Sequence, residues 1–160
     1  MANYISRLIK EDEISYKGVF DFKEFFSLVR NFLERYDYDI DEKEYKDESS
    51  GGLKSLTVKW AADKKLDDYN KAIIKLKFKL SKCKETYVDG AKVMEGNLNL
   101  SVKVEVERDY DDKWSKSPFK KLSMALYGKY VADEKQNYVD KLVKNLIDNL
   151  KTEVKQYLKI

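Results

Sequence analysis

The sequence predicts an α+β fold, an antiparallel sheet of about five strands with an N-terminal helix and a long C-terminal helix packed on one face. Apolar and polar side chains alternate throughout NLNLSVKVEVERDY, residues 97–110, as expected for a long strand with one buried face. The same alternation recurs in AIIKLKFKL, residues 72–80. Apolar side chains recur at helical spacing in residues 22–36 and 134–158, so each segment can cover the apolar face of a sheet.

The length and composition fit a single α+β domain, residues 1–160. A chain of 160 residues can bury one sizeable core, and 42% hydrophobic with 38% charged residues is typical of a folded, soluble protein. We expect the cytoplasm, because the N-terminus carries charges where a signal peptide is apolar and no apolar run is long enough for a transmembrane segment. The Lys- and Glu-rich composition resembles that of thermophile proteins, although an AT-rich genome would also raise Lys and Tyr.

The first strand and the first helix are predicted before residue 37. Residues 4–17 contain short alternating pieces that predict a strand. Asp21 offers an N-cap, and Glu24 three residues later forms a capping box, so a helix is expected over residues 22–36. Its apolar stripe can line a ligand cavity, but such a stripe more often belongs to the core. The stripe consists of Phe22, Phe25, Phe26, Val29, Leu33 and Tyr36.

A hairpin follows this helix. Residues 38–48 are acidic and contain little to bury, which is typical of a solvated edge strand. The Ser-Ser-Gly-Gly turn at residues 49–52 returns the chain into an alternating strand over residues 53–61. A polar link over residues 63–70 then leads to the lysine-rich strand at residues 72–80.

The next hairpin must contain a bulge. A two-residue turn at Asp89-Gly90 pairs even-numbered with odd-numbered residues, yet the apolar positions are even-numbered on both strands. One strand therefore carries an extra residue. We predict it at Gly96, because a bulge that needs positive φ costs least at glycine, and residues 81–84 are the alternative.

The position of the bulge decides what faces the lysines. An extra residue at the predicted glycine pairs Lys75 with Glu105, which makes the lysine row a solubilising feature. The alternative pairs Lys75 with Lys103 and gathers the lysines into a basic patch.

The C-terminal third is predicted to end the sheet and to form helices. Residues 110–116 are acidic and close the sheet. Ser117 as N-cap and Pro118 at the first helical position start a helix over residues 118–130. The last helix, over residues 134–158, is about 37 Å long at a rise of about 1.5 Å per residue, enough to cross a whole sheet.

Several chemistries are disfavoured by the residues that the sequence lacks. The chain has no His, no Cys/His cluster and no phosphate-loop or dinucleotide glycine pattern. Cys83 has no His to act as its base, so we interpret it as a bystander thiol in a reducing compartment. Asp109, Asp111 and Asp112 lack the Gly and distal Glu of an EF-hand loop. We therefore expect no enzymatic activity, no metal and no cofactor.

The order of elements is similar to that of START-like proteins, which have a helix-grip architecture: a strand, a helix, several antiparallel strands and a long C-terminal helix, here over residues 14–158. In that architecture the C-terminal helix lies against a curved sheet, and a cavity between them holds a hydrophobic ligand. The resemblance implies a small apolar or aromatic ligand, and the candidate lining residues are Phe25, Trp60, Phe78, Leu146 and Leu150.

Three noncatalytic functions remain open. The first is the binding of that ligand. The second is a protein–protein interaction or scaffold module that dimerises or binds a partner through the C-terminal helix, where Leu142 and Ile147 widen the apolar stripe. The third is weak polyanion binding by Lys75, Lys77 and Lys79. Sequence-specific nucleic-acid binding is disfavoured, because only four of the 32 basic residues are Arg.

The predicted core joins the two helices to the sheet in one continuous cluster. Its members are Phe22, Phe26, Val29, Leu33, Val58, Trp60, Leu76, Phe78, Leu100, Val102, Val104, Leu146 and Leu150.

Overall fold

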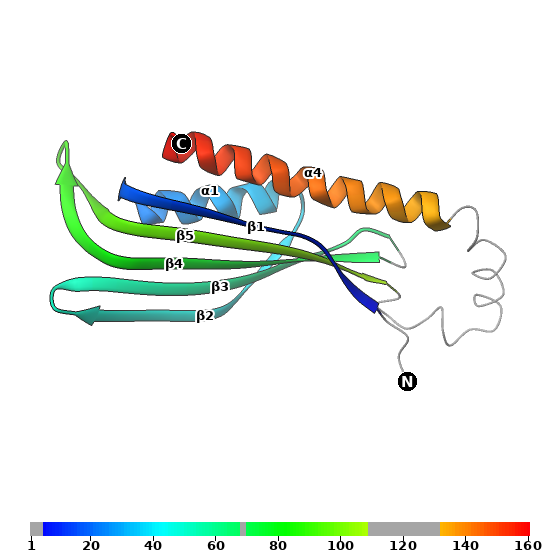
Figure 1. Ribbon diagram of the computed structural model, residues 1–160, viewed down its shortest axis with the longest axis horizontal. Helices are drawn as coiled ribbons and strands as arrows, with labels where there is room; N and C mark the ends of the chain where they lie inside the picture. The colour runs from blue at the N-terminus through cyan, green and yellow to red at the C-terminus, as the bar shows by residue number, and fades with distance from the viewer. Residues whose placement is uncertain (1–4, 68–69, 109–131) are drawn as a thin grey trace.

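The computed structural model describes residues 5–67, 70–108 and 132–160. Its strands are β1 (Ile5–Phe20), β2 (Asp39–Ser50), β3 (Leu53–Lys65), β4 (Asn70–Val88) and β5 (Ala91–Arg108), and its helices are α1 (Phe22–Arg35) and α4 (Ala132–Leu158). The strands form one antiparallel sheet in the order β1-β5-β4-β3-β2. Both helices lie on the same side of this sheet (Figure 1). The predicted α+β class is confirmed. The acidic segment at 110–116 and the helix predicted at 118–130 lie outside the described residues.

Helix α1 begins where the sequence predicts because Asp21 caps it. The Asp21 carboxylate accepts hydrogen bonds from the backbone N–H groups of Lys23 at 3.0 Å and Glu24 at 3.3 Å. The Glu24 carboxylate in turn accepts a hydrogen bond from the Tyr157 hydroxyl at 3.1 Å. Glu24 thereby links the first turn of α1 to the C-terminal part of α4.

The core contains the predicted residues with two differences. Eleven of the thirteen predicted side chains are buried, whereas Phe22 and Phe26 are half-buried and pack against the cluster. The centre is aromatic. The Phe78 ring lies 5.9 Å from that of Phe25, 4.8 Å from that of Phe26 and 4.7 Å from that of Trp60, measured between centroids. Edge-to-face contacts of this kind favour one fixed arrangement of the rings.

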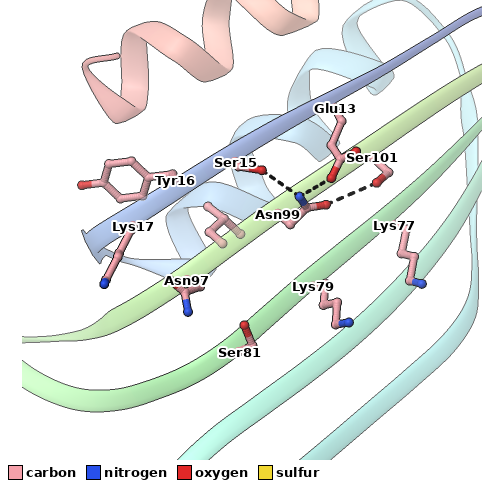
Figure 2. Close-up of a pocket in the computed structure, with 11 residues that line it drawn as sticks. Glu13, Ser15, Tyr16, Lys17, Lys77, Lys79, Ser81, Asn97, Asn99 and Ser101 are labelled. Atoms are coloured by element: carbon pink, nitrogen blue, oxygen red, sulfur yellow. Dashed lines mark hydrogen bonds between the residues drawn. The ribbon is translucent and has the colours of Figure 1, made fainter.

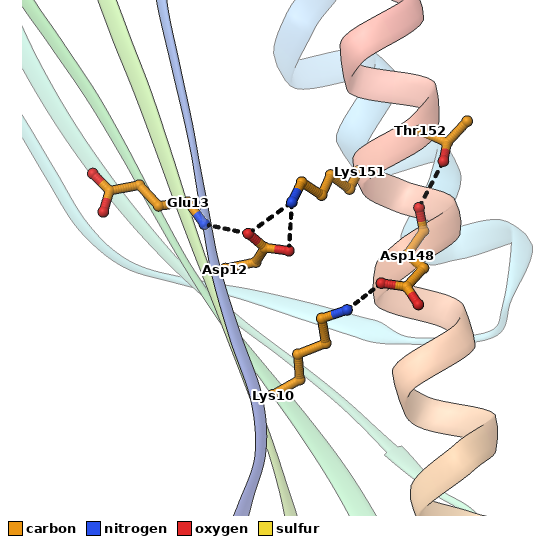
Figure 3. Close-up of polar contacts among 6 residues, drawn as sticks. All are labelled: Lys10, Asp12, Glu13, Asp148, Lys151 and Thr152. Carbon is orange, nitrogen blue, oxygen red and sulfur yellow. Dashed lines mark hydrogen bonds and ion pairs between the residues drawn. The ribbon is translucent and has the colours of Figure 1, made fainter.

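Helix α4 is tied to the edge strand β1 by ion pairs (Figure 3). The Lys151 ammonium donates to both carboxylate oxygens of Asp12, at 3.0 and 2.9 Å, and the Lys10 ammonium pairs with Asp148. The backbone N–H of Glu13 also donates to Asp12, at 3.0 Å. Burial by itself would raise the pKa of Asp12, but the hydrogen bond from Lys151 helps to hold that pKa below its usual value.

The predicted bulge exists, but its predicted position at Gly96 is wrong. The β4–β5 pairing shifts between Ser81 and Lys84, so residues 82–83 of β4 stand opposite a single residue of β5. The alternative register is therefore the observed one, and it pairs Lys75 with Lys103.

Gly96 is the residue opposite the bulge, and the bulge leaves it no room for a side chain. A Cβ at Gly96 would lie 2.6 Å from the Sγ and 2.7 Å from the Cα of Cys83. The residue with positive φ at the bulge is Lys82, at 52°, and not the predicted glycine. A bulge bends the strand that carries it. Beyond this point the β4–β5 hairpin turns toward the side on which the helices lie (Figure 1).

Candidate ligand-binding sites

The side chains predicted to line a ligand cavity lie together, but they contact one another. Phe25, Trp60, Phe78, Leu146 and Leu150 all belong to the buried core cluster. The ring contacts of Phe78 occupy the space between α1 and the sheet. A hollow of about 150 Å³ lies beside Leu146 and is also lined by Leu142, Tyr38 and Lys64. Beside Leu150, between α4 and the sheet, the void is only about 10 Å³. A void of this size holds about one water molecule at most.

The two residues predicted to widen the stripe of α4 do not share one surface. Leu142 is 47% exposed, whereas Ile147 is 1% exposed and packs against the sheet. The large apolar side chain that accompanies Leu142 on the exposed side of α4 is Tyr138, one turn earlier and 66% exposed. Among the described side chains of α4, Tyr138 and Leu142 are therefore the ones that offer an exposed apolar surface.

A cleft of about 310 Å³ lies where the bent end of the β4–β5 hairpin approaches the first turn of α1. We refer to it as the α1 cleft. Its apolar floor consists of Phe22, Leu56, Leu80, Val93 and Met94. Leu56, Leu80 and Met94 belong to the buried core and reach the cleft only with their edges, whereas Phe22 and Val93 are half-buried. Its volume falls at the lower end of the range for small-molecule sites, about 300–1,000 Å³.

Charged side chains surround the mouth of the α1 cleft. The Lys54 ammonium donates to Glu85 at 2.6 Å, and Lys92 lies 3.1 Å from the same carboxylate. These two hydrogen bonds lower the pKa of Glu85, and the bond to Glu85 raises the pKa of Lys54. Both effects keep Lys54 and Glu85 charged across the neutral range. The polar residues of the mouth are Asp21, Lys23, Tyr45, Asp47, Lys54, Glu85 and Lys92.

The opposite face of the sheet carries a second, wider site. A groove of about 700 Å³ crosses β1, β5 and β4 on the face away from the helices, and we call it the open-face groove (Figure 2). Asn99 lies at its centre. The Asn99 side-chain amide donates to Glu13 at 2.5 Å and to Ser15 at 2.9 Å, and it accepts from the Ser101 hydroxyl at 3.3 Å. The groove also presents the side chains of Lys17, Lys77, Lys79, Ser81 and Asn97.

The lone thiol lies at the bulge and is buried. The Cys83 Sγ lies 3.4 Å from the carbonyl oxygen of Ser81 and 3.7 Å from that of Asn97. Burial raises the pKa of the Cys83 thiol, which disfavours the reactive thiolate. Within residues 5–67, 70–108 and 132–160, no three Cys, Asp or Glu side chains are placed to hold a metal ion.

The sequence pattern does not indicate the α1 cleft. Leu56, Leu80 and Met94 have the periodicity of ordinary core residues, and an amphipathic pattern does not show whether a neighbouring side chain fills the space above them. The one sequence signal related to the cleft is that the apolar positions of the strands before and after Asp89-Gly90 are both even-numbered, which a two-residue turn cannot pair. A mismatch requires a bulge, and a bulge bends the hairpin that forms one wall.

Comparison with known proteins assigns no family. No protein-family model matches the chain, and no curated protein is significantly similar to it in sequence. In the part of the chain that the structure describes, neither helix has the length and apolar character needed to span a membrane.

Proposed function

We propose that this protein is a noncatalytic binding protein that holds a small amphiphile in the α1 cleft. The observation that carries the proposal is the apolar floor of the cleft, formed by the half-buried Phe22 and Val93 together with the edges of the buried Leu56, Leu80 and Met94, beneath a ring of charged side chains. Apolar surface that remains accessible inside a concave site favours a ligand with an apolar body. The polar ring favours a head group that forms hydrogen bonds.

The charges of the ring favour a head group without net charge. The mouth has three lysines and three acids, so their formal charges cancel. Glu85 already balances part of the charge of Lys54 and Lys92 through its two ion pairs. A charged head group would compete with these pairs, whereas hydroxyl groups can join them as donors or acceptors. A sugar or polyol attached to a short alkyl or aryl group has this chemistry.

The proposed location differs from the one that the helix-grip resemblance implies. That resemblance places a ligand between the sheet and the C-terminal helix, where the side chains of Ile147 and Leu150 pack on β1 and β5. The α1 cleft instead uses the first turn of α1 and the bent hairpin as its walls. A ligand can enter it without separating α4 from the sheet, so binding costs no rearrangement of the core.

The test combines native mass spectrometry of the purified protein with thermal melts in neutral alkyl glucosides of increasing chain length. We expect a co-purifying small molecule, and a melting temperature that rises with glucoside concentration. The rise should increase with chain length until the chain fills the cleft. Phe22→Ala should weaken binding about tenfold, since it removes part of the apolar floor.

Tyr87→Ala is the matched control for this test. Tyr87 is an aromatic residue of the same hairpin that is 71% exposed and does not line the cleft. It should bind the glucosides as the wild type does. Equal loss of binding in both variants, or no stabilisation of the wild type by any chain length, would rule out the cleft as the site.

A second candidate function, self-association or partner binding through α4, is favoured by the exposed pair Tyr138 and Leu142. Ile147→Lys cannot test it, because a charge at a side chain that is 1% exposed would disrupt the core. The suitable variant is Leu142→Lys, with Gln156→Lys on the same helix as control. We expect a concentration-dependent dimer in sedimentation velocity that only Leu142→Lys abolishes. If the wild-type protein remains monomeric at high concentration, self-association through α4 is ruled out.

A further inference from the structure

The observed register places like charges directly opposite each other on the open face of the sheet. Lys59 of β3 faces Lys77 of β4, and Lys75 of β4 faces Lys103 of β5. Directly opposed like charges destabilise a sheet. A local arrangement that costs stability is more often found where a protein binds something than elsewhere.

Acidic neighbours compensate only part of this charge. Lys59 pairs with Glu44 of β2 at 3.1 Å, and Lys75 pairs diagonally with Glu105 at 3.5 Å. Lys77 is different, because it faces Lys59 and has no ion pair with any residue that the structure describes.

Three lysines without an ion pair among the described residues line the open-face groove. Lys17, Lys77 and Lys79 all line it, and none of them pairs with an acid among the described residues. Lys77 and Lys79 alternate along β4, so their Cα atoms are separated by about 6.6 Å at a rise of about 3.3 Å per residue. Glu13 is the one acid among the described lining residues, so the formal charge of this lining is two positive units.

Neutral side chains that form hydrogen bonds line the groove together with these lysines. Ser81 and Asn97 line the groove beside Lys77 and Lys79, as does Ser101, whose hydroxyl already donates to Asn99. Amide and hydroxyl groups can donate to phosphate oxygens from a fixed strand position, while the lysines supply the charge. The groove therefore presents charged donors, Lys77 and Lys79, and a neutral donor, Ser81, along strand β4.

From this arrangement we propose that the open-face groove binds a linear phosphate chain without bases, inorganic polyphosphate. This binding is independent of the α1 cleft, which opens on the other side of the sheet. A peptide is the poorer fit, because the backbone groups of the inner strands β4 and β5 are already paired within the sheet and leave none for a peptide backbone.

A single-stranded nucleic acid is also a poorer fit, since proteins that bind one combine basic grooves with aromatic side chains on which bases stack. Tyr16 is the one aromatic residue among the described residues that line the groove. Its hydroxyl donates to the carbonyl oxygen of Val19 at 3.1 Å, and its ring packs edge-on against Phe20 at 6.3 Å. The ring is thus held by its own strand and offers no platform for a base.

The experiment measures binding of fluorescently labelled short-chain polyphosphate by anisotropy at several salt concentrations. The variants are the double change Lys77→Gln with Lys79→Gln and, as a matched control of equal charge, Lys144→Gln with Lys155→Gln on the exposed side of α4. We expect the groove variant to lose at least tenfold in affinity. Its slope of log affinity against log salt should fall by about 1.4, at about 0.7 for each lost phosphate contact. The control should match the wild type in both quantities.

Three outcomes overturn the proposal. The first is that wild-type protein does not bind polyphosphate at physiological salt. The second is that both double variants lose affinity equally, which would indicate a diffuse attraction by net charge. The third is tighter binding of a single-stranded RNA of matched phosphate number, which would assign the groove to nucleic acid. Circular dichroism of the groove variant checks that it is folded, and removal of Lys77, which faces Lys59, should leave its melting temperature equal or higher.

Discussion

Replacing Gly96 by alanine adds a single methyl group where the β4–β5 hairpin has no space for it. The new Cβ would lie 2.6 Å from the Sγ of Cys83, 2.7 Å from its Cα and 2.8 Å from the carbonyl oxygen of Lys82. Two of these three atoms belong to the backbone. Rotation of the Cys83 side chain therefore cannot relieve the contact, and one of the two strands must move.

The cost can be estimated from the usual effect of overpacking. Extra methylenes in a well-packed site cost about 1–3 kcal/mol, and occasionally more when the backbone has to shift. Because two backbone atoms are in the way, we expect the upper end, about 3 kcal/mol. For a chain of this size that loss lowers the melting temperature by roughly 6–12 °C.

The assay is urea denaturation followed by circular dichroism, with two comparison variants. Gly90 has a φ of +81° and nothing within 4 Å of its Cβ position, so Gly90→Ala tests positive φ without a clash and should cost about 1 kcal/mol. Cys83→Ala in the Gly96→Ala background removes only the Sγ contact and should recover less than half of the loss. A Gly96→Ala protein within about 0.5 kcal/mol of the wild type, with an unchanged m-value, would refute the assigned bulge.

Three further predictions concern stability. Leu100→Ala should lower the free energy of unfolding by about 2–4 kcal/mol in urea denaturation, since Leu100 is 1% exposed in the core. A loss below about 0.5 kcal/mol would show that β5 does not contribute to the core. Lys151→Met should cost about 1 kcal/mol, because its pair with Asp12 is only partly shielded from water. The lowered pKa of Asp12 stabilises the fold above the usual carboxyl range, so the variant should lose less stability than the wild type on acidification below about pH 4; parallel acid profiles would contradict this. Burial raises the pKa of Tyr38 to about 12 from an ordinary value of 10.0, so stability present below pH 10 should fall between pH 10 and about 12. Tyr38→Phe should remove about 2–3 kcal/mol of that loss, and an unchanged alkaline profile would show that Tyr38 does not cause it.

Alternation and helical spacing were sufficient to predict the central strands and both described helices. They set the faces of Phe78 and Leu100, and the Asp21 cap set the start of α1. The even and odd numbering of the apolar positions on the two strands requires an extra residue in the β4–β5 hairpin, but it does not show which strand carries that residue. Gly96 fits either answer, since a glycine suits a bulge and also suits the position opposite one. Gly96 is the residue opposite the bulge. Lys82 adopts the positive φ of 52°, and Gly96 has no side chain that would collide with Cys83.

The candidate sites were harder to predict for a different reason. Apolar periodicity reports which side chains leave water, and Phe25, Phe78 and Leu150 do so in the structure. Periodicity does not report whether another side chain fills the space beside them. The α1 cleft depends on the curvature of the hairpin, and the open-face groove depends on which polar residues lie opposite one another. Both properties are set by the position of one bulge.

The bulge has a practical consequence for modifying the protein. Before the bulge, the residues of β4 that face the core have even numbers, as Leu80 does. After the bulge, the odd-numbered Cys83 faces the core. The alignment of the core strands is thus locked at residues 82–83 and does not depend on the length of the loop at the tip. A guest peptide or dye-binding tag inserted between Asp89 and Gly90 should leave that alignment intact. Because Glu85 and Lys92 of the same hairpin line the α1 cleft, a reporter at the tip should respond when the cleft is occupied.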